Sequence, residues 1–186
     1  MSDVRITAGE LRGRRLRVPA ESLRPTSDKA RQAFFNRIGD RISGGVFLYL
    51  FSGTGSFSFE AVSRGARRAI AVELSPVQST AIARTAREWN VPVDCRAGDV
   101  MRVLRTLRSE GPFDVVYADP PYAYPDYPSL IDTIDRELPL ADAAVVAIEH
   151  RSGPLPFATG NLARLVFRKT ARYGSVSISI FDARAE

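Results

Sequence analysis

The chain has 186 residues, of which 45% are hydrophobic and 25% charged, a composition typical of a folded protein with one hydrophobic core. No apolar run approaches the roughly 18 residues of a membrane span, and the amino terminus lacks the apolar core of a signal peptide, so we expect a cytoplasmic protein with no membrane partner. The single cysteine and single histidine, Cys95 and His150, exclude an intrachain disulfide and a His/Cys zinc site. We therefore expect no metal, and we expect His150 at the surface of a strand end.

The net charge of +5 is concentrated near the amino terminus. Residues 1–41 hold ten basic and five acidic residues, residues 42–186 hold sixteen of each, and 24 of the 26 cations are arginines. Arginine binds phosphate in a bidentate manner and stacks on bases, so this asymmetry indicates nucleic acid as a partner. A solvated basic surface is an equally ordinary interpretation of charge alone.

Two short elements are predicted before the main fold. Residues 4–18 alternate in polarity around Gly9 and Gly13, which predicts a small β-hairpin that presents arginines. Residues 27–39 place apolar side chains at helical spacing, which predicts an amphipathic helix. We expect residues 1–41 to extend a core that covers residues 42–186.

From residue 42 onward, short apolar runs alternate with helical stretches. The predicted strands are rich in β-branched and aromatic residues and cover 46–51, 69–74, 91–96, 113–118 and 143–149. The helical patterns between them cover 57–65, 76–88, 99–109 and 127–138. This alternation predicts an α/β fold with a doubly wound, mostly parallel sheet. Residues 162–173 and 175–183, joined at Gly174, predict an antiparallel hairpin at its edge, which gives seven strands in a single domain, 1–186.

The residues that follow the first strand of this sheet form a candidate cofactor loop. In an open α/β sheet, ligands bind at the carboxyl ends of the strands, and here the chain reads Ser52-Gly53-Thr54-Gly55. The loop has neither the lysine of a phosphate-binding loop nor the complete dinucleotide fingerprint. By itself it is equally compatible with a plain strand-to-helix turn.

Two acidic residues strengthen the cofactor interpretation. Glu73 ends the second strand about 20 residues beyond the glycines, where a carboxylate can accept both ribose hydroxyls. Asp99 follows the third strand, where it can meet an adenine edge or simply cap the next helix. A nucleoside cofactor with no phosphate-binding lysine suggests S-adenosylmethionine.

The fourth strand runs directly into Asp119-Pro120-Pro121-Tyr122. Two consecutive prolines fix the backbone in an extended form and rigidly display an acid, a carbonyl and an aromatic ring. Such a motif can accept both hydrogens of an exocyclic amine, whose lone pair then points at a methyl donor, while the ring stacks on an extruded base. The motif is similar to the D/N/S-P-P-Y/F/W motif of amino-group methyltransferases, and the chain resembles Rossmann-like class I methyltransferases.

Residues 23–36, LRPTSDKARQAFFN, closely resemble the R-P-T-x-D-x-x-R-x-x-x-F-N signature of the bacterial 16S rRNA guanine-N2 methyltransferases, the RsmD-like family. The similarity extends through the opening hairpin, the glycine loop, the catalytic strand and the closing hairpin. The resemblance implies methylation of one guanine in small-subunit (16S) ribosomal RNA, on the small ribosomal subunit or an assembly intermediate, with S-adenosylmethionine as cofactor.

The resemblance also implies roles for individual residues. The cofactor would be held by Ser52, Gly53, Thr54, Gly55, Glu73, Leu74, Asp99 and Val100, and Arg24 and Thr26 would close over cofactor or RNA. The target amine would be held by Asp119, Pro120, Pro121 and Tyr122. RNA phosphates would be contacted by Arg12, Arg14, Arg15 and Arg17.

Three positions depart from the family pattern. Tyr49 stands where the family usually has an aspartate, Ser58 where it has glycine, and Ser75 where an acid often follows Glu73. Tyr49 keeps open a catalytically inactive RNA-binding protein as one alternative. A DNA or RNA adenine-N6 methyltransferase is another, although 186 residues leave no room for a separate target-recognition domain. We expect a monomer that uses ribosomal protein for part of its docking surface.

Overall fold

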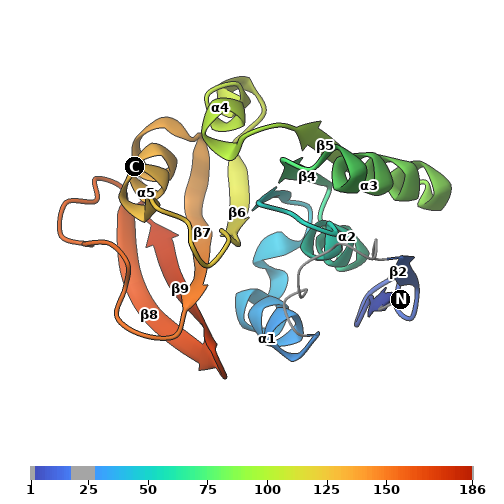
Figure 1. Cartoon of the computed structure of the whole chain (residues 1–186), viewed down its shortest axis with the longest axis horizontal. Helices are drawn as coiled ribbons and strands as arrows, with labels where there is room; N and C mark the ends of the chain where they lie inside the picture. Colours follow the sequence, from blue (N-terminus) through green and yellow to red (C-terminus); the bar gives the residue numbers. More distant parts are fainter. Residues whose placement is uncertain (1–2, 18–27, 186) are drawn as a thin grey trace.

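The computed structural model describes residues 3–17 and 28–185, which form a two-stranded and a seven-stranded sheet with helices on both faces of the larger one (Figure 1). The small sheet is the predicted amino-terminal hairpin, with β1 (Asp3–Arg5) antiparallel to β2 (Arg15–Arg17). Helix α1 (Asp28–Ile38) and a 3-10 turn, η1 (Gly39–Ile42), follow. The mixed α/β architecture predicted from the sequence is confirmed.

The seven strands are arranged in the order β5-β4-β3-β6-β7-β9-β8. The chain fills one half from β3 outward and then returns to β6 on the other side of β3, so strand order reverses between β3 and β6. All neighbours from β5 to β7 are parallel, and β9 is antiparallel to both β7 and β8. The strands are β3 (Val46–Leu50), β4 (Arg68–Glu73), β5 (Val93–Ala97), β6 (Phe113–Ala118), β7 (Leu140–Arg151), β8 (Leu165–Tyr173) and β9 (Val176–Ala183).

Side-chain alternation along the buried strands creates two apolar layers. In β3, Phe47 and Tyr49 face the layer that contains α1, α2 and α3, whereas Leu48 and Leu50 face the layer that contains α4 and α5. A strand buried on both faces must be apolar throughout, which is why its sequence is a continuous run. The remaining helices are α2 (Ser56–Ser63), α3 (Pro76–Trp89), α4 (Val100–Leu104), α5 (Tyr127–Glu137) and the 3-10 turn η2 (Leu107–Ser109).

Three predictions from the sequence differ from the structure. The stretch 99–109 is not one helix, because α4 ends at Leu104 and η2 follows as a separate turn. Strand β7 is longer than 143–149 at both ends, because it begins at Leu140 beside β6 and continues to Arg151 alongside β9. His150 is buried rather than at the surface, because Ser179 of β9 lies 2.8 Å from its Nε2 atom. In the described ranges, no helix is long and apolar enough to cross a membrane.

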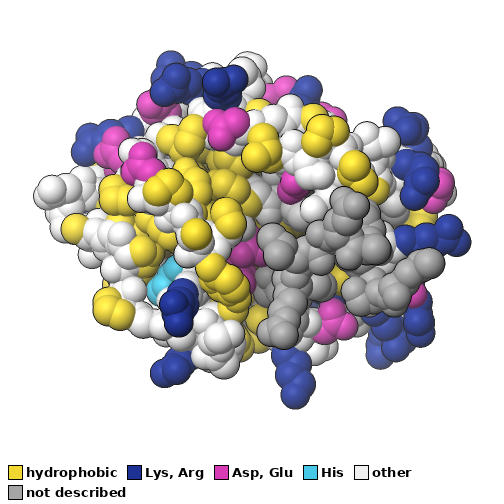
Figure 2. All heavy atoms as spheres, in the orientation of Figure 1, with side chains coloured by type: hydrophobic (Ala, Val, Ile, Leu, Met, Phe, Trp, Pro, Cys, Tyr) yellow, Lys and Arg dark blue, Asp and Glu magenta, His cyan; other side chains and the backbone are white. Residues whose placement is uncertain are grey.

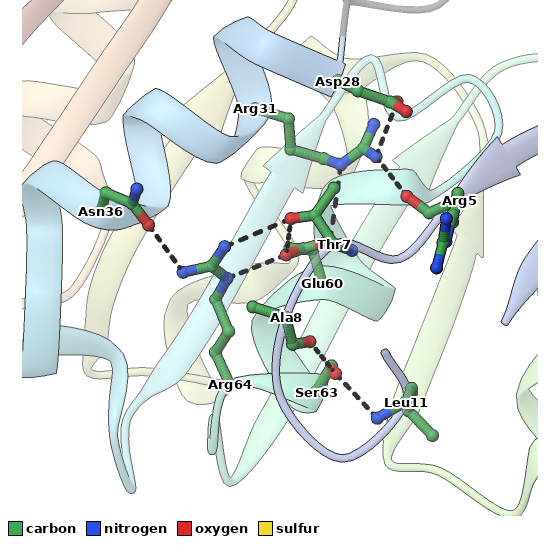
Figure 3. Close-up of polar contacts among 10 residues, drawn as sticks. All are labelled: Arg5, Thr7, Ala8, Leu11, Asp28, Arg31, Asn36, Glu60, Ser63 and Arg64. Atoms are coloured by element: carbon green, nitrogen blue, oxygen red, sulfur yellow. Dashed lines mark hydrogen bonds and ion pairs between the residues drawn. The ribbon is translucent and has the colours of Figure 1, made fainter. Parts of the chain in front are cut away.

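A buried polar cluster attaches the amino-terminal hairpin and α1 to α2 (Figure 3). The carboxylate of Glu60, which is fully buried, accepts hydrogen bonds from Thr7 N at 2.8 Å, Thr7 Oγ1 at 2.6 Å and Arg64 Nε at 2.9 Å. The fully buried Arg31 places Nε 3.6 Å from the same carboxylate and donates from Nη2 to the Arg5 carbonyl at 2.6 Å. One glutamate of α2 therefore connects three segments that are distant in sequence.

The hairpin loop also packs tightly against the end of α2. Ser63 Oγ accepts from Leu11 N at 2.9 Å and donates to the Ala8 carbonyl at 2.5 Å. Gly9 has φ +78, and a Cβ at this position would lie 1.7 Å from the Ser63 carbonyl oxygen. Only glycine fits here, since any side chain would separate the loop from the helix.

Candidate active site

The glycine loop leaves β3 in a tight turn that only small residues allow. Gly53 and Gly55 have φ values of +51 and +75, and Gly55 N donates to the Ser52 carbonyl at 2.7 Å. A Cβ on Gly55 would lie 2.9 Å from Ile82 Cγ1 on α3. The two glycines thus permit both the left-handed backbone and the close approach of α3.

Glu73 joins this loop to the first turn of α3. Its Oε2 atom accepts from Gly53 N at 2.6 Å and its Oε1 atom accepts from Ser75 N at 2.8 Å. Among the described residues, backbone N–H groups and no cation contact the carboxylate, and each oxygen has further lone pairs for other donors. The carboxylate that the sequence predicted to hold a ribose therefore lies against the predicted loop.

Unsatisfied polar atoms gather at the same place. Ser52 Oγ and Gln78 Oε1 are buried and form no hydrogen bond with a described residue, and Gln78 Oε1 would lie 3.6 Å from a Cβ built on Gly53. Buried polar groups are normally hydrogen-bonded, so such atoms fit a bound polar ligand. Leu74, which directly follows Glu73 at the end of β4, leaves 67% of its surface exposed and offers an apolar contact for a ligand. These residues fit a nucleoside cofactor.

Gln78 was not predicted from the sequence as a site residue, because a lone glutamine on a predicted helix carries no signal.

Asp99 has the capping role that the sequence left open. It is the N-cap of α4, and its side chain accepts from Arg102 N at 3.1 Å. Asp99 itself is exposed, whereas Val100 is buried in the layer beneath α4. Since the cap uses one oxygen, the exposed carboxylate retains acceptor capacity at the end of β5.

The Asp119–Tyr122 motif lies beside the glycine loop because β6 and β3 are neighbours. Leu50 pairs with Ala118, and Asp119 N donates to the Leu50 carbonyl at 3.1 Å. Beyond the motif, the ring of Tyr124 meets that of Phe51 edge-on at 5.1 Å. The structure thus brings together the two motifs that the sequence identified separately.

Within the motif, each residue has a distinct environment. Asp119 is half-buried and Pro120 is buried, whereas Pro121 is exposed and Tyr122 leaves 67% of its surface exposed. The Pro121 carbonyl accepts from Tyr124 N at 2.7 Å, which closes a turn after the prolines. An exposed ring on a rigid turn is available for stacking.

Buried tyrosines lie behind the motif. Tyr117 donates its hydroxyl hydrogen to Glu149 Oε2 at 2.6 Å, and Tyr49 packs against the rings of Tyr117 and Phe57 at 5.8 and 5.2 Å. Burial, followed by the nearby Glu149 charge for Tyr117 and the Asp119 charge for Tyr49, raises both tyrosine pKa values well above the usual range. Tyr49 is therefore a neutral member of an aromatic cluster and does not supply the carboxylate charge of the usual family residue. Glu149, an acid at the end of a predicted apolar strand, was missed.

The four predicted RNA-binding arginines are exposed on the amino-terminal hairpin. Arg14 places its guanidinium 5.3 Å from the ring centre of Trp89, and Arg15 lies 3.7 Å from Asp3. Trp89 is the last residue of α3, which starts at the glycine-loop end and runs back for 14 residues, about 20 Å. Arg14 is therefore near the edge where the parallel strands begin, whereas the Asp119–Tyr122 motif lies at the edge where they end. The other two are Arg12 and Arg17.

Two predicted residues, Arg24 and Thr26, lie outside the described residues. Across 3–17 and 28–185, there is no group of three or more His, Cys, Asp or Glu side chains that could hold a metal ion.

Comparison with known proteins assigns the family. The family model described as "Conserved hypothetical protein 95" matches residues 4–182. The chain belongs to this family. It is 31% identical to "Putative rRNA methyltransferase YlbH" of Bacillus subtilis over 97% of the chain and 100% of that protein. It is 30% identical to "Ribosomal RNA small subunit methyltransferase D" of Escherichia coli, over 78% of the chain and 74% of that protein.

A solved structure agrees with this assignment. The chain superposes on "Putative methyltransferase yhhF from Escherichia coli" with a TM-score of 0.87 and 26% identity, and the match covers all of both chains. The RsmD-like resemblance and the class I methyltransferase fold expected from the sequence are therefore confirmed.

Proposed function

We propose that this protein transfers a methyl group from S-adenosylmethionine to the N2 amine of a guanine in small-subunit ribosomal RNA. The observation that carries the proposal is the hydrogen bond from Asp119 N to the Leu50 carbonyl, which holds the Asp119–Tyr122 motif beside the Ser52–Gly55 loop. An acceptor amine and a methyl donor must meet at this junction. The names of the relatives support ribosomal RNA as the substrate.

The cofactor would be held by the residues around the glycine loop. Glu73 would accept the ribose hydroxyls with the lone pairs that Gly53 and Ser75 leave available, and Ser52 Oγ would gain the hydrogen-bond partner that it lacks. Asp99 would accept from the adenine amine. When bound, S-adenosylmethionine supplies an electrophilic methyl group.

The chain's contribution to catalysis is orientation. The Asp119 carboxylate and the Pro120 carbonyl accept the two amine hydrogens, so the nitrogen lone pair is localised and directed at the methyl position. Tyr122 stacks on the extruded base and fixes its plane. As the nitrogen–carbon bond forms, the sulfur–methyl bond would break and leave S-adenosylhomocysteine, and the amine releases one proton to the Asp119 carboxylate or to water.

Methyl transfer to ribosomal subunits tests the proposal. Small subunits from cells that lack this protein are incubated with radiolabelled S-adenosylmethionine, and the digested RNA is resolved into nucleosides. We expect labelled N2-methylguanosine with the wild type. With Asp119→Ala we expect a loss of at least about 100-fold, because one of the two acceptors that orient the amine is gone.

Other outcomes would assign other functions. Label in N6-methyladenosine would keep the site and overturn the guanine. Absence of label in RNA, together with no saturable binding of S-adenosylmethionine by the folded protein, would favour the RNA-binding alternative that Tyr49 keeps open.

We also propose that the protein acts as a monomer on a particle that already carries ribosomal protein. The predicted arginine surface is confined to a short hairpin, so part of the docking surface must come from elsewhere. Stronger methylation of naked RNA than of protein-bearing particles would contradict this.

A further inference from the structure

The two halves of the sheet offer different amounts of room at the edge where the parallel strands end, which we call the carboxyl edge. On the β3, β4 and β5 side, this edge carries the glycine loop, Glu73 and Asp99, which the proposed cofactor occupies. The catalytic motif follows β6, at the middle of the sheet. The nucleotides that flank the target must therefore extend across the other half, formed by β7, β9 and β8.

The turn between β8 and β9 reaches this same edge. Arg151, the last residue of β7, pairs with Val176, the first residue of β9, and Val176 pairs with Tyr173, the last residue of β8. Ser152 fastens the end of β7 to the turn, because its N donates to the Ser175 carbonyl at 2.9 Å and its Oγ donates to the Gly174 carbonyl at 3.0 Å. Neighbouring strands are about 4.8 Å apart, so the turn, which joins the second and third strands beyond β6, lies about 10–14 Å from the catalytic strand.

Two exposed cations lie at the end of this hairpin, and a third lies four residues before the end of β8. Arg151 is the last residue of β7, and Arg172 directly precedes Tyr173, the last residue of β8. Lys169 pairs with Ile180, which pairs with Ala147, which pairs with Tyr117, so Lys169 lies level with Tyr117 of the catalytic strand. All three side chains are exposed, and none forms an ion pair with a described residue. We call Arg151, Lys169 and Arg172 the β8–β9 cations. In Figure 2, Lys or Arg side chains lie on the viewed face near the end of β7 and the lower part of β8, beside the single His.

Acidic side chains do not neutralise this end of the hairpin. Residues 168–175 contain no Asp or Glu, and Glu149, the nearest acid on β7, is buried and accepts from Tyr117. Pairing begins one residue before Lys169, because Asp182 pairs with both Arg41 at 2.9 Å and Arg168 at 2.8 Å. Cations without an acidic partner between Lys169 and the turn favour a polyanion that binds on the carboxyl side of this hairpin.

We propose that the β8–β9 cations bind the RNA phosphates that flank the target nucleotide. This inference rests on the proposed function and assigns its substrate a second contact, across the catalytic motif from the amino-terminal arginines. Phosphate contacts of this kind set the register of a nucleic acid on a protein without reading its sequence. The cofactor occupies the other half of the edge, so the two ligands do not compete.

The test replaces the three cations together by Arg151→Gln, Lys169→Gln and Arg172→Gln. Methyl transfer to small subunits is measured against subunit concentration and salt, and cofactor binding is measured separately by calorimetry. We expect KM for subunits to rise about ten-fold while kcat stays within about two-fold. The slope of log affinity against log salt should become less steep by about 0.7 to 0.9 for each lost contact. The dissociation constant of S-adenosylmethionine should be unchanged.

A matched control removes the same charge elsewhere. Arg67→Gln, Arg105→Gln and Arg184→Gln alter three other exposed arginines that form no ion pair with described residues, although Arg184 donates to the Ala163 carbonyl at 3.2 Å. If this control raises KM as much as the test variant, net charge rather than a phosphate site is responsible and the inference is wrong. Should KM change for particles but not for naked ribosomal RNA, the surface contacts protein, which also overturns it.

The result separates this inference from the proposed function. If the wild type labels no RNA, the proposed function fails, and this inference fails with it. If the wild type labels guanine and the β8–β9 variant retains the wild-type KM and salt slope, only the second contact is wrong. The single variant Lys169→Gln changes an exposed position on an edge strand, so it carries little risk to folding. Its KM for subunits and its salt slope provide a second measurement of the same contact.

Discussion

Two carboxylates of this protein each join distant segments, yet only one of them lies at the proposed site. Glu60 is fully buried, accepts from Thr7 and Arg64, and has Arg31 beside it. Glu73 retains 8% exposure and accepts from the backbone N–H groups of Gly53 and Ser75, with no cation among its described contacts. The first arrangement satisfies the carboxylate within the fold, whereas the second leaves it able to accept from a ligand.

The difference teaches how to distinguish structural from functional acids in this protein. A carboxylate paired with buried guanidinium groups mainly contributes stability, since breaking the pair leaves an uncompensated buried charge. A carboxylate held only by backbone N–H groups costs less to alter and contributes mainly to binding. Substitutions at the two glutamates should therefore affect different measurements.

The largest effect is expected at Glu60. Glu60→Ala removes the acceptor of Thr7 and Arg64 and leaves the fully buried Arg31 only the exposed Asp28, at 2.9 Å, as an acidic partner, and we expect the free energy of unfolding to fall by about 3 kcal/mol. Urea denaturation measures the change. Glu88→Ala is the control, because Glu88 forms an exposed pair with Arg84 at 3.6 Å that contributes less than about 1 kcal/mol. Equal losses in the two variants would contradict the assignment.

Gly55→Ala should have the next largest effect, at the cofactor end of the comparison. The left-handed backbone and the 2.9 Å approach to Ile82 together predict a loss of about 1–3 kcal/mol, with weaker binding of S-adenosylmethionine. Gly39→Ala is the matched control, since Gly39 also has positive φ, +55, but no neighbour within 4 Å of a built Cβ. A loss no greater than that of the control would show that the contact with α3 is unimportant.

At Glu73, we expect binding to change more than stability. Glu73→Gln replaces one acceptor oxygen by an amide donor, so the dissociation constant of S-adenosylmethionine should rise about ten-fold, or about 1.4 kcal/mol. The free energy of unfolding should fall by no more than about 1 kcal/mol. Calorimetry and urea denaturation measure the two quantities on the same sample. A large loss of stability with unchanged binding would reverse the roles of the two glutamates.

The smallest change in stability is expected at His150, which extends the comparison to a buried group that is neutral. Its Nδ1 donates to the Arg151 carbonyl and its Nε2 accepts from Ser179, while burial lowers its pKa below 6.5. Below pH 6.5 the unfolded chain binds the extra proton more readily, so the contribution to stability is complete above that pH and is lost as pH falls through the lowered pKa. The stability difference between wild type and His150→Gln should narrow below pH 6.5. A pH-independent difference would contradict this.

Much of the fold could be predicted from the sequence because its signals are local. The strand predicted at 113–118 is β6 residue for residue, since a buried parallel strand must be a short apolar run. The prediction of one helix over 99–109 was wrong, because helical periodicity does not show that α4 ends at Leu104 and that a separate 3-10 turn follows. The burial of His150 was also missed, since its partner Ser179 is supplied by another strand.

The sequence by itself determined the strand-and-helix alternation, the Ser52–Gly55 loop, Glu73 and the Asp119–Tyr122 motif, because each depends on residues that are adjacent or regularly spaced. Only the tertiary structure decided that Glu60 joins Thr7, Arg31 and Arg64, and that Gln78 lies against Gly53. It alone also placed Arg151 and Arg172 at the carboxyl edge and Lys169 level with Tyr117, since β9 enters between β7 and β8. Burial and ion pairing arise between segments far apart in the chain, so they become defined only when strand order and packing are fixed.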